Sequence, residues 1–318
     1  MFQAVLVVFL QVGAGAAGPA LAPECGAGGR EGTNVWERAK HPELRRYCDL
    51  LASGAAKLAA NASMAREVVG IAEEAEKTNP GRAAPLVLKG RALMRLARFE
   101  ESYQAFVEAK KRDVNAVEDP VALLAFARAS SRSNHEADAR DAFRALLPRA
   151  SVLSATDRGL VYLEAGLLSM AKGPTGLDDA IVALRQARRE AQDYAATLCT
   201  LALALALDRG GNRDEAKAIL DERARADARM ITNDTRAKDA LGPMSIEVDA
   251  MAAMGLEPTD AARAKEAWAR YAAAAGAGPW ADHAKARAGG TTARPGASAA
   301  PRGSVAPPKP PTPPTLRQ

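Results

Sequence analysis

Residues 85–113 read PLVLKGRALMRLARFEESYQAFVEAKKRD, and this stretch predicts two antiparallel helices joined by a short turn. Apolar and small residues recur at helical spacing on both sides of the turn. Gly90 lies in the first helix, where a partner helix has to come close. Ser102, Phe106 and Ala109 follow at spacings of four and three, so they share one face of the second helix. We therefore expect a helical hairpin.

The same alternation of small and large residues recurs along the chain. The clearer copies are Ala127 with Ala139, Phe143 and Leu146, and Ala204 with Ala216 and Leu220. Three weaker copies are Gly166 with Ala180, Leu184 and Ala187; Ala56 with Val68, Ala72 and Ala75; and Ala252 with Ala264, Trp268 and Tyr271. Breaks rich in Gly, Pro, Asp and Asn separate the helices. Helices joined by such short loops lie antiparallel to their neighbours, so we expect an array of hairpins.

A period in the mid-thirties, with small residues at these offsets, resembles the tetratricopeptide repeat (TPR) family. The resemblance covers about residues 43–288 and implies an all-α fold of antiparallel hairpins stacked as an α-solenoid. Three positions depart from the family pattern: Val68 and Ser102 replace the expected Ala, and Arg223 stands where a small or apolar residue is expected. The repeat positions build the scaffold in this interpretation and carry no chemistry.

The two ends of the chain differ from the helical repeat domain expected over residues 30–288. Residues 1–22 contain the apolar run Ala4–Val12 followed by small residues, which is typical of a signal peptide. No Lys or Arg precedes this run, so an uncleaved membrane anchor is the alternative. Residues 289–318 are dominated by Pro, Gly, Ala, Ser and Thr and predict a disordered tail. We therefore expect an exported protein of the bacterial periplasm or cell envelope, or a membrane-anchored one.

The three cysteines leave one question open. Cys25 and Cys48 both follow the predicted signal peptide and could form a disulfide in an oxidising compartment, or remain two free thiols. Cys199 lies in the apolar run TLCTLALALAL and is expected to pack as a small hydrophobic residue.

The net charge of +5 belongs to the C-terminal end of the chain. From Lys285 onward there are six basic residues and no acidic one, which leaves 37 basic and 38 acidic residues in the rest. Aromatic residues make up only 4%, so bases would find few stacking partners. The sequence does not favour nucleic-acid binding.

Catalytic motifs are scarce. His41, His135 and His283 are far apart, have no metal-ligand spacing, and are each expected to be ordinary solvated side chains. No nucleophile elbow or phosphate-binding glycine loop occurs, and adjacent acidic pairs diverge around a helix. We expect no enzymatic activity, no cofactor and no metal.

One set of arginines is a candidate binding site. Arg91 and Arg95 share a face of one first helix, Arg128 and Arg132 occupy the equivalent places in the next unit, and Arg209 matches Arg95 and Arg132 two units on. The family resemblance implies that first helices line a concave groove. Our hypothesis is a basic stripe that binds carboxylates of an acidic or C-terminal segment of a partner protein. The alternative is a solvated helix face with Glu partners.

These patterns favour a non-enzymatic scaffold or adaptor of the cell envelope that binds other proteins, with membrane contact only through an uncleaved N-terminal segment. The alternative from another class is a structural spacer tethered in the envelope by its N-terminal segment and tail. An enzyme built on a helical superhelix, such as a murein lyase, would need a catalytic domain after the repeats, where only the tail remains.

Overall fold

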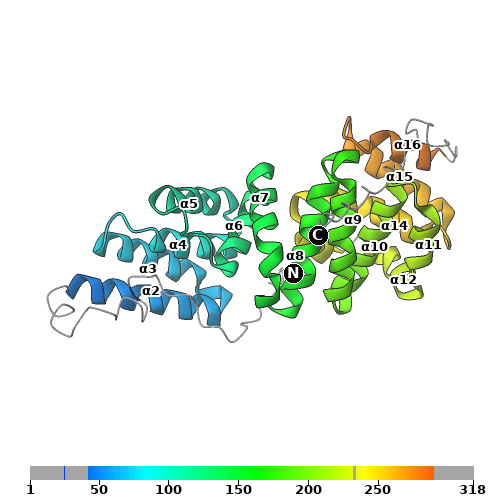
Figure 1. The fold of residues 1–318 in the computed structure, drawn as a ribbon. Helices are drawn as coiled ribbons and strands as arrows, with labels where there is room; N and C mark the ends of the chain where they lie inside the picture. The colour runs from blue at the N-terminus through cyan, green and yellow to red at the C-terminus, as the bar shows by residue number, and fades with distance from the viewer. Residues whose placement is uncertain (1–24, 26–41, 232–233, 290–318) are drawn as a thin grey trace, which may run out of the picture.

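The computed structural model describes Cys25 and residues 42–231 and 234–289 (Figure 1). These residues form fifteen α-helices and no strand, which confirms the predicted all-α class. The predicted signal peptide at 1–22 and the tail from residue 290 onward lie outside the described residues. Within the described ranges, no helix combines the length and the apolar character that crossing a bilayer requires.

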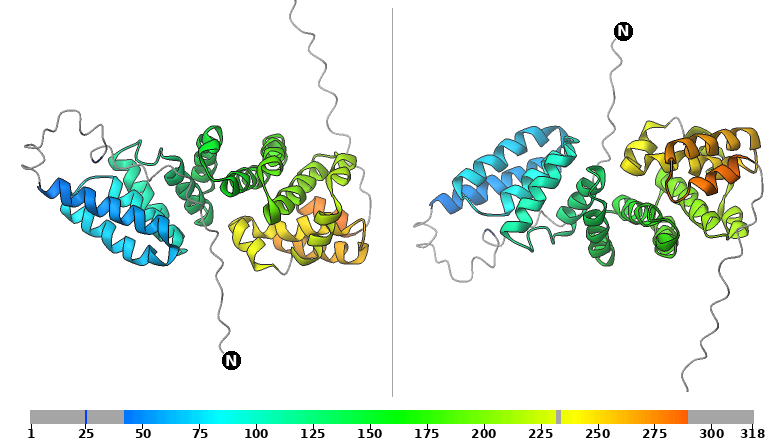
Figure 2. Two further views of the ribbon diagram at one scale, coloured as in Figure 1. Left: turned by 90° about the horizontal axis from the view of Figure 1, so that it is seen from below. Right: turned by 90° about the horizontal axis from the view of Figure 1, so that it is seen from above.

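The helices follow the chain in an elongated arrangement, with α2 near one end, α8 in the middle and α16 at the other end (Figures 1 and 2). Their bounds are α2 Pro42–Ala60, α3 Ala65–Thr78, α4 Ala84–Arg95, α5 Phe99–Arg112, α6 Pro120–Arg132, α7 Glu136–Leu146, α8 Ala155–Met170, α9 Leu177–Glu190, α10 Asp193–Arg209, α11 Arg213–Ile219, α12 Glu222–Ile231, α13 Thr235–Leu241, α14 Glu247–Leu256, α15 Ala261–Ala275 and α16 Ala281–Ala288. Short 3-10 segments are η3 Ala62–Met64, η4 Leu147–Val152, η5 Gly173–Gly176 and η6 Gly242–Ile246. Neighbouring helices pack as adjacent pairs, among them α2 with α3, α4 with α5, α6 with α7 and α8 with α9.

The pair of α4 and α5 shows why particular residue types are needed. A Cβ added at Gly90 would lie 2.9 Å from the ring of Phe106, so only a hydrogen atom fits between the two helices. The hydroxyl of Ser102 donates a buried hydrogen bond of 2.7 Å to the carbonyl of Gly90. This hydrogen bond satisfies the Ser102 hydroxyl in the core, so serine takes the place of the expected Ala without an unpaired buried polar group.

All twelve repeat positions taken as core are buried. They are Gly90, Phe106, Ala109, Ala127, Ala139, Phe143, Gly166, Ala180, Leu184, Ala204, Ala216 and Leu220. Gly166 repeats the role of Gly90, because a Cβ there would lie 2.6 Å from Cγ of Leu184 in the partner helix. Close helix approach therefore recurs at the positions that the repeat pattern singled out.

The region after α10 differs from the regular pattern. The second helix of the Ala204 unit, α11, ends already at Ile219, and a new helix begins after Asp221. The Asp221 carboxylate accepts a hydrogen bond of 2.7 Å from the backbone N–H of Ala224, which satisfies a free donor of the first turn of α12. Arg223 consequently lies on a different helix with its side chain 61% exposed, which explains its departure from the repeat pattern.

The apolar interior consists of three clusters. The first lies between α2, α3 and α4, the second is centred on α6 and α7, and the third fills the C-terminal half from α9 to α16. The helix α8 belongs to the last two. Its residues Val161, Ala165 and Leu168 face the second cluster, whereas Leu163 and Leu167 face the third. One helix therefore joins two cores.

The cysteine question is answered by the structure. Cys25 and Cys48 form a disulfide with a Cα–Cα distance of 5.5 Å, and both residues pack against the first cluster. Cys199 is fully buried, and burial raises the pKa of its thiol to about 12. Cys199 is therefore a core residue with little thiolate at neutral pH.

Candidate functional site

Four of the five candidate arginines lie close together on neighbouring first helices. Arg91 and Arg95 project from α4, and Arg128 and Arg132 from α6, which packs against α4. The four side chains lie within electrostatic range of one another. Besides burial, the charge of Arg95 lowers the pKa of Arg91, and the charge of Arg128 lowers the pKa of both Arg95 and Arg132. We call these four residues the arginine row.

Arg91 and Arg95 form the open part of the arginine row. Both are partly exposed, and neither makes an ion pair or hydrogen bond with any other residue in the described part of the chain. Burial lowers the pKa of both guanidinium groups, and the more distant charges of Asp119 and Asp157 act in the opposite direction. An arginine remains charged near neutral pH in spite of such shifts. Two cationic groups with free donors therefore stand side by side.

Arg128 is the paired member of the row. Its Nε lies 3.1 Å from both carboxylate oxygens of Glu164, and its Nη1 lies 3.5 Å from Asp157; both partners belong to α8. Its side chain is only 14% exposed. Burial alone would lower the pKa of Arg128, but the charges of Glu164 and Asp157 outweigh burial and raise it. At this residue the structure matches the alternative of an arginine with acidic partners, although its buried Nη2 has no hydrogen-bond partner among the described residues.

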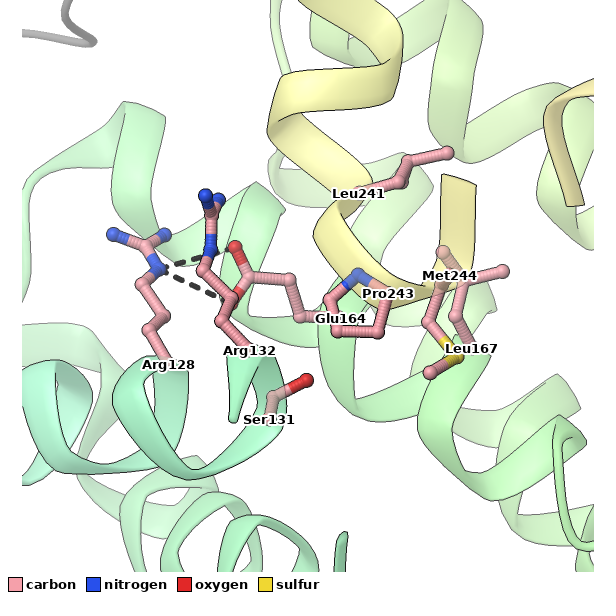
Figure 3. A pocket seen from close by; sticks show the side chains of 8 residues that line it. All are labelled: Arg128, Ser131, Arg132, Glu164, Leu167, Leu241, Pro243 and Met244. Carbon is pink, nitrogen blue, oxygen red and sulfur yellow. Dashed lines mark hydrogen bonds and ion pairs between the residues drawn. The ribbon is translucent and has the colours of Figure 1, made fainter. Parts of the chain in front are cut away.

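Arg132 lies at the far end of the row and contacts a distant part of the chain. Its Nη2 donates a hydrogen bond of 2.8 Å to the main-chain carbonyl of Asp239, and its guanidinium carbon lies 5.0 Å from the ring centre of Phe99. A small pocket beside it has a volume of about 10 Å³, which is room for about one water molecule (Figure 3). The pocket is lined by Arg128, Ser131, Arg132, Glu164, Leu167, Leu241, Pro243 and Met244.

Arg209 is not part of this surface. Its side chain is 0% exposed, with Nη2 2.8 Å from the Glu247 carboxylate and 2.7 Å from the Tyr271 hydroxyl. Its guanidinium carbon also lies 4.9 Å from the ring centre of Trp280. We remove Arg209 from the candidate site because the third apolar cluster encloses it and a buried carboxylate neutralises it.

His283 also differs from the sequence expectation of a solvated side chain. It lies on α16, is 19% exposed, and its Nε2 is 2.9 Å from the buried carboxylate of Asp208. Its ring meets Trp268 and Trp280 edge to face. Arg287, also on α16, reaches the same carboxylate at 3.3 Å. These contacts dock α16 onto α10, and we assign them a structural role.

The two carboxylates that pair with Arg128 were not predicted from the sequence. Glu164 and Asp157 lie on the first helix of the next unit, and an acidic residue there is the signal that could have indicated a partner for Arg128. Asp239 could not have been found this way, because it contributes a backbone carbonyl from 107 residues downstream.

Comparison with known proteins does not add to this picture. No protein-family model matches the chain, and no curated protein matches it significantly. Among the described residues, no group of three or more His, Cys, Asp or Glu side chains is placed to hold a metal ion.

Proposed function

We propose that this chain is a TPR-like α-solenoid of the bacterial cell envelope that acts as a non-enzymatic scaffold and binds acidic segments of partner proteins. The arginine row lies in the concave groove of the solenoid in this proposal. Arg91 and Arg95 bind the carboxylates of the partner in this proposal. Arg128 lies beside them and is held in place by Glu164 and Asp157.

The observation that carries the proposal is the difference between Arg128 and the pair formed by Arg91 and Arg95. Arg128 is neutralised by Glu164 and Asp157, whereas Arg91 and Arg95 have no carboxylate within ion-pair distance among the described residues. Both are already partly buried, so a partner carboxylate would displace little water from them and would gain charge-assisted hydrogen bonds. A partly desolvated guanidinium group fits a bidentate carboxylate better than a lysine does.

The test is a double charge reversal, Arg91→Glu with Arg95→Glu. We expect the affinity for an N-acetylated hexaglutamate peptide, measured by titration calorimetry at low salt, to fall by at least about tenfold, because each charge-assisted hydrogen bond contributes about 1.5–3 kcal/mol. The matched control is Arg140→Glu with Arg144→Glu, a pair with the same spacing on the second helix α7. An equal loss in both double variants would mean that only net charge matters and would contradict a specific groove.

The proposed compartment has its own support in the disulfide between Cys25 and Cys48, since disulfides persist in oxidising compartments and are rare in the cytoplasm. We expect thiol alkylation of the protein in host cells, after denaturation without reductant, to label Cys199 but neither Cys25 nor Cys48. Denaturation after full reduction should label all three. Labelling of all three without reduction would contradict export.

The second candidate function is a structural spacer tethered in the envelope by its N-terminal segment and tail. A spacer needs its two ends and no groove. We expect the Arg91 and Arg95 double reversal to abolish function in the host and deletion of residues 290–318 to leave it intact; the reverse result would favour the spacer.

A further inference from the structure

The segment of residues 235–246, which comprises α13 and η6, lies against the arginine row although it belongs to the C-terminal half of the chain. We call it the crossing segment. It reaches α6 through η6, and the hydrogen bond from Arg132 to Asp239 joins residues 107 positions apart. Leu241, Pro243 and Met244 of this segment line the small pocket beside Arg128 and Arg132 (Figure 3). Met244 contacts both the second and the third apolar cluster.

The crossing segment offers Arg132 a substitute for a carboxylate. The Asp239 carbonyl belongs to the last turn of α13, where carbonyl groups have no partner within the helix and carry the negative end of the helix dipole. Gly242, with φ of +56°, follows the last residue of this helix. A neutral carbonyl thus occupies a cationic donor, to which the full negative charge of a carboxylate would be attracted more strongly.

The crossing segment is less deeply buried than the helix that follows it. The helix α13 has only seven residues, and the described ones that are buried are Ala237 and Leu241. No residue of η6 is buried. In contrast, nine of the ten residues of the adjoining helix α14 are buried. Segments with few buried contacts open at low free-energy cost while the rest of the protein stays folded.

From these observations we infer that the crossing segment is an internal competitor that occupies the Arg132 end of the groove until a partner displaces it. The inference rests on the proposed function. An acidic segment would first bind Arg91 and Arg95, and its next carboxylate would take Arg132 from the Asp239 carbonyl. Binding of a partner and release of residues 235–246 are therefore coupled.

Amide hydrogen exchange tests the coupling, because it reports how readily residues 235–246 open with and without peptide. In the wild type, saturating hexaglutamate should speed exchange in these residues by about tenfold or more. In Arg132→Met, which lacks the hydrogen bond to Asp239, exchange in the same residues should already be fast without peptide, and peptide should not speed it further. The adjoining helix α14 serves as the control, because its exchange should not change in either protein.

The outcomes separate the two proposals. Unchanged exchange in residues 235–246 of the wild type with hexaglutamate bound would overturn the internal competitor and leave the groove standing. Absence of hexaglutamate binding to the wild type would overturn the groove and the competitor together. The wild-type measurement stands by itself if the Arg132→Met variant does not fold.

Discussion

Replacement of Arg209 by Met is expected to lower the free energy of unfolding by about 3–5 kcal/mol, because it leaves a buried carboxylate without its cation. Glu247 is 7% exposed, and its oxygens meet Arg209 at 2.8 Å and the Tyr271 hydroxyl at 3.1 Å. Burial, reinforced by the charge of Glu247, raises the pKa of Tyr271, so its hydroxyl stays protonated and remains as the carboxylate's donor. One neutral donor does not replace the ion pair.

The measurement is urea unfolding followed by tryptophan fluorescence in a Trp36→Phe background. The chain has three tryptophans, so this background leaves Trp268 and Trp280, both in the cluster that surrounds Arg209. The double variant Arg209→Met with Glu247→Met should recover much of the loss, since an apolar pair replaces both charges. A single variant as stable as wild type would show that the buried pair contributes nothing.

The substitution Gly255→Ala should destabilise the protein by about 2 kcal/mol, against the usual gain of about 1 kcal/mol for Ala over Gly within a helix. Its Cβ would lie 2.4 Å from Cβ of Ala228 in α12 and 3.0 Å from Cδ2 of Leu201 in α10. Ala228 has no rotatable side chain, so the backbones of α12 and α14 would have to separate.

The matched control for this prediction is Gly70→Ala. Gly70 lies inside α3, is exposed, and would meet nothing within 4 Å of an added Cβ. This variant should gain about 0.5–1 kcal/mol from helix propensity alone. Urea unfolding followed by far-ultraviolet circular dichroism should therefore move the two midpoints in opposite directions. Shifts of the same sign would contradict the close approach of α12 and α14.

The helices and their pairing could be predicted because the relevant information is local. The small residue Gly90 and the large residue Phe106 lie within one hairpin, at spacings that repeat along the chain. The break between α11 and α12 was not predicted, because Leu220 and Asp221 continue the helical spacing. The extended backbone of Leu220 and the hydrogen bond from Ala224 to the Asp221 carboxylate mark the new helix start in the structure.

The candidate site could be predicted in part. The four-residue spacing on α4 and α6 placed four arginines together, since that spacing defines a helix face. The repeat equivalence of Arg209 with Arg95 and Arg132 grouped it with them, but its surroundings depend on Glu247, 38 residues further along the chain, and on Trp280 still further on. The engagement of Arg132 by Asp239 likewise arises from a contact between distant segments. Which charge is open and which is neutralised is therefore a property of the folded chain.

The position of α8 in two apolar clusters has a consequence for dissecting this protein into fragments. A fragment that ends before α8 would expose the core residues that Val161, Ala165 and Leu168 cover. A fragment that begins after α8 would expose those that Leu163 and Leu167 cover. The two halves share one helix, so a fragment of either half must include α8 if it is to fold by itself. Hairpins added by duplication would leave both clusters undisturbed only if they were placed before the first hairpin or after the last one.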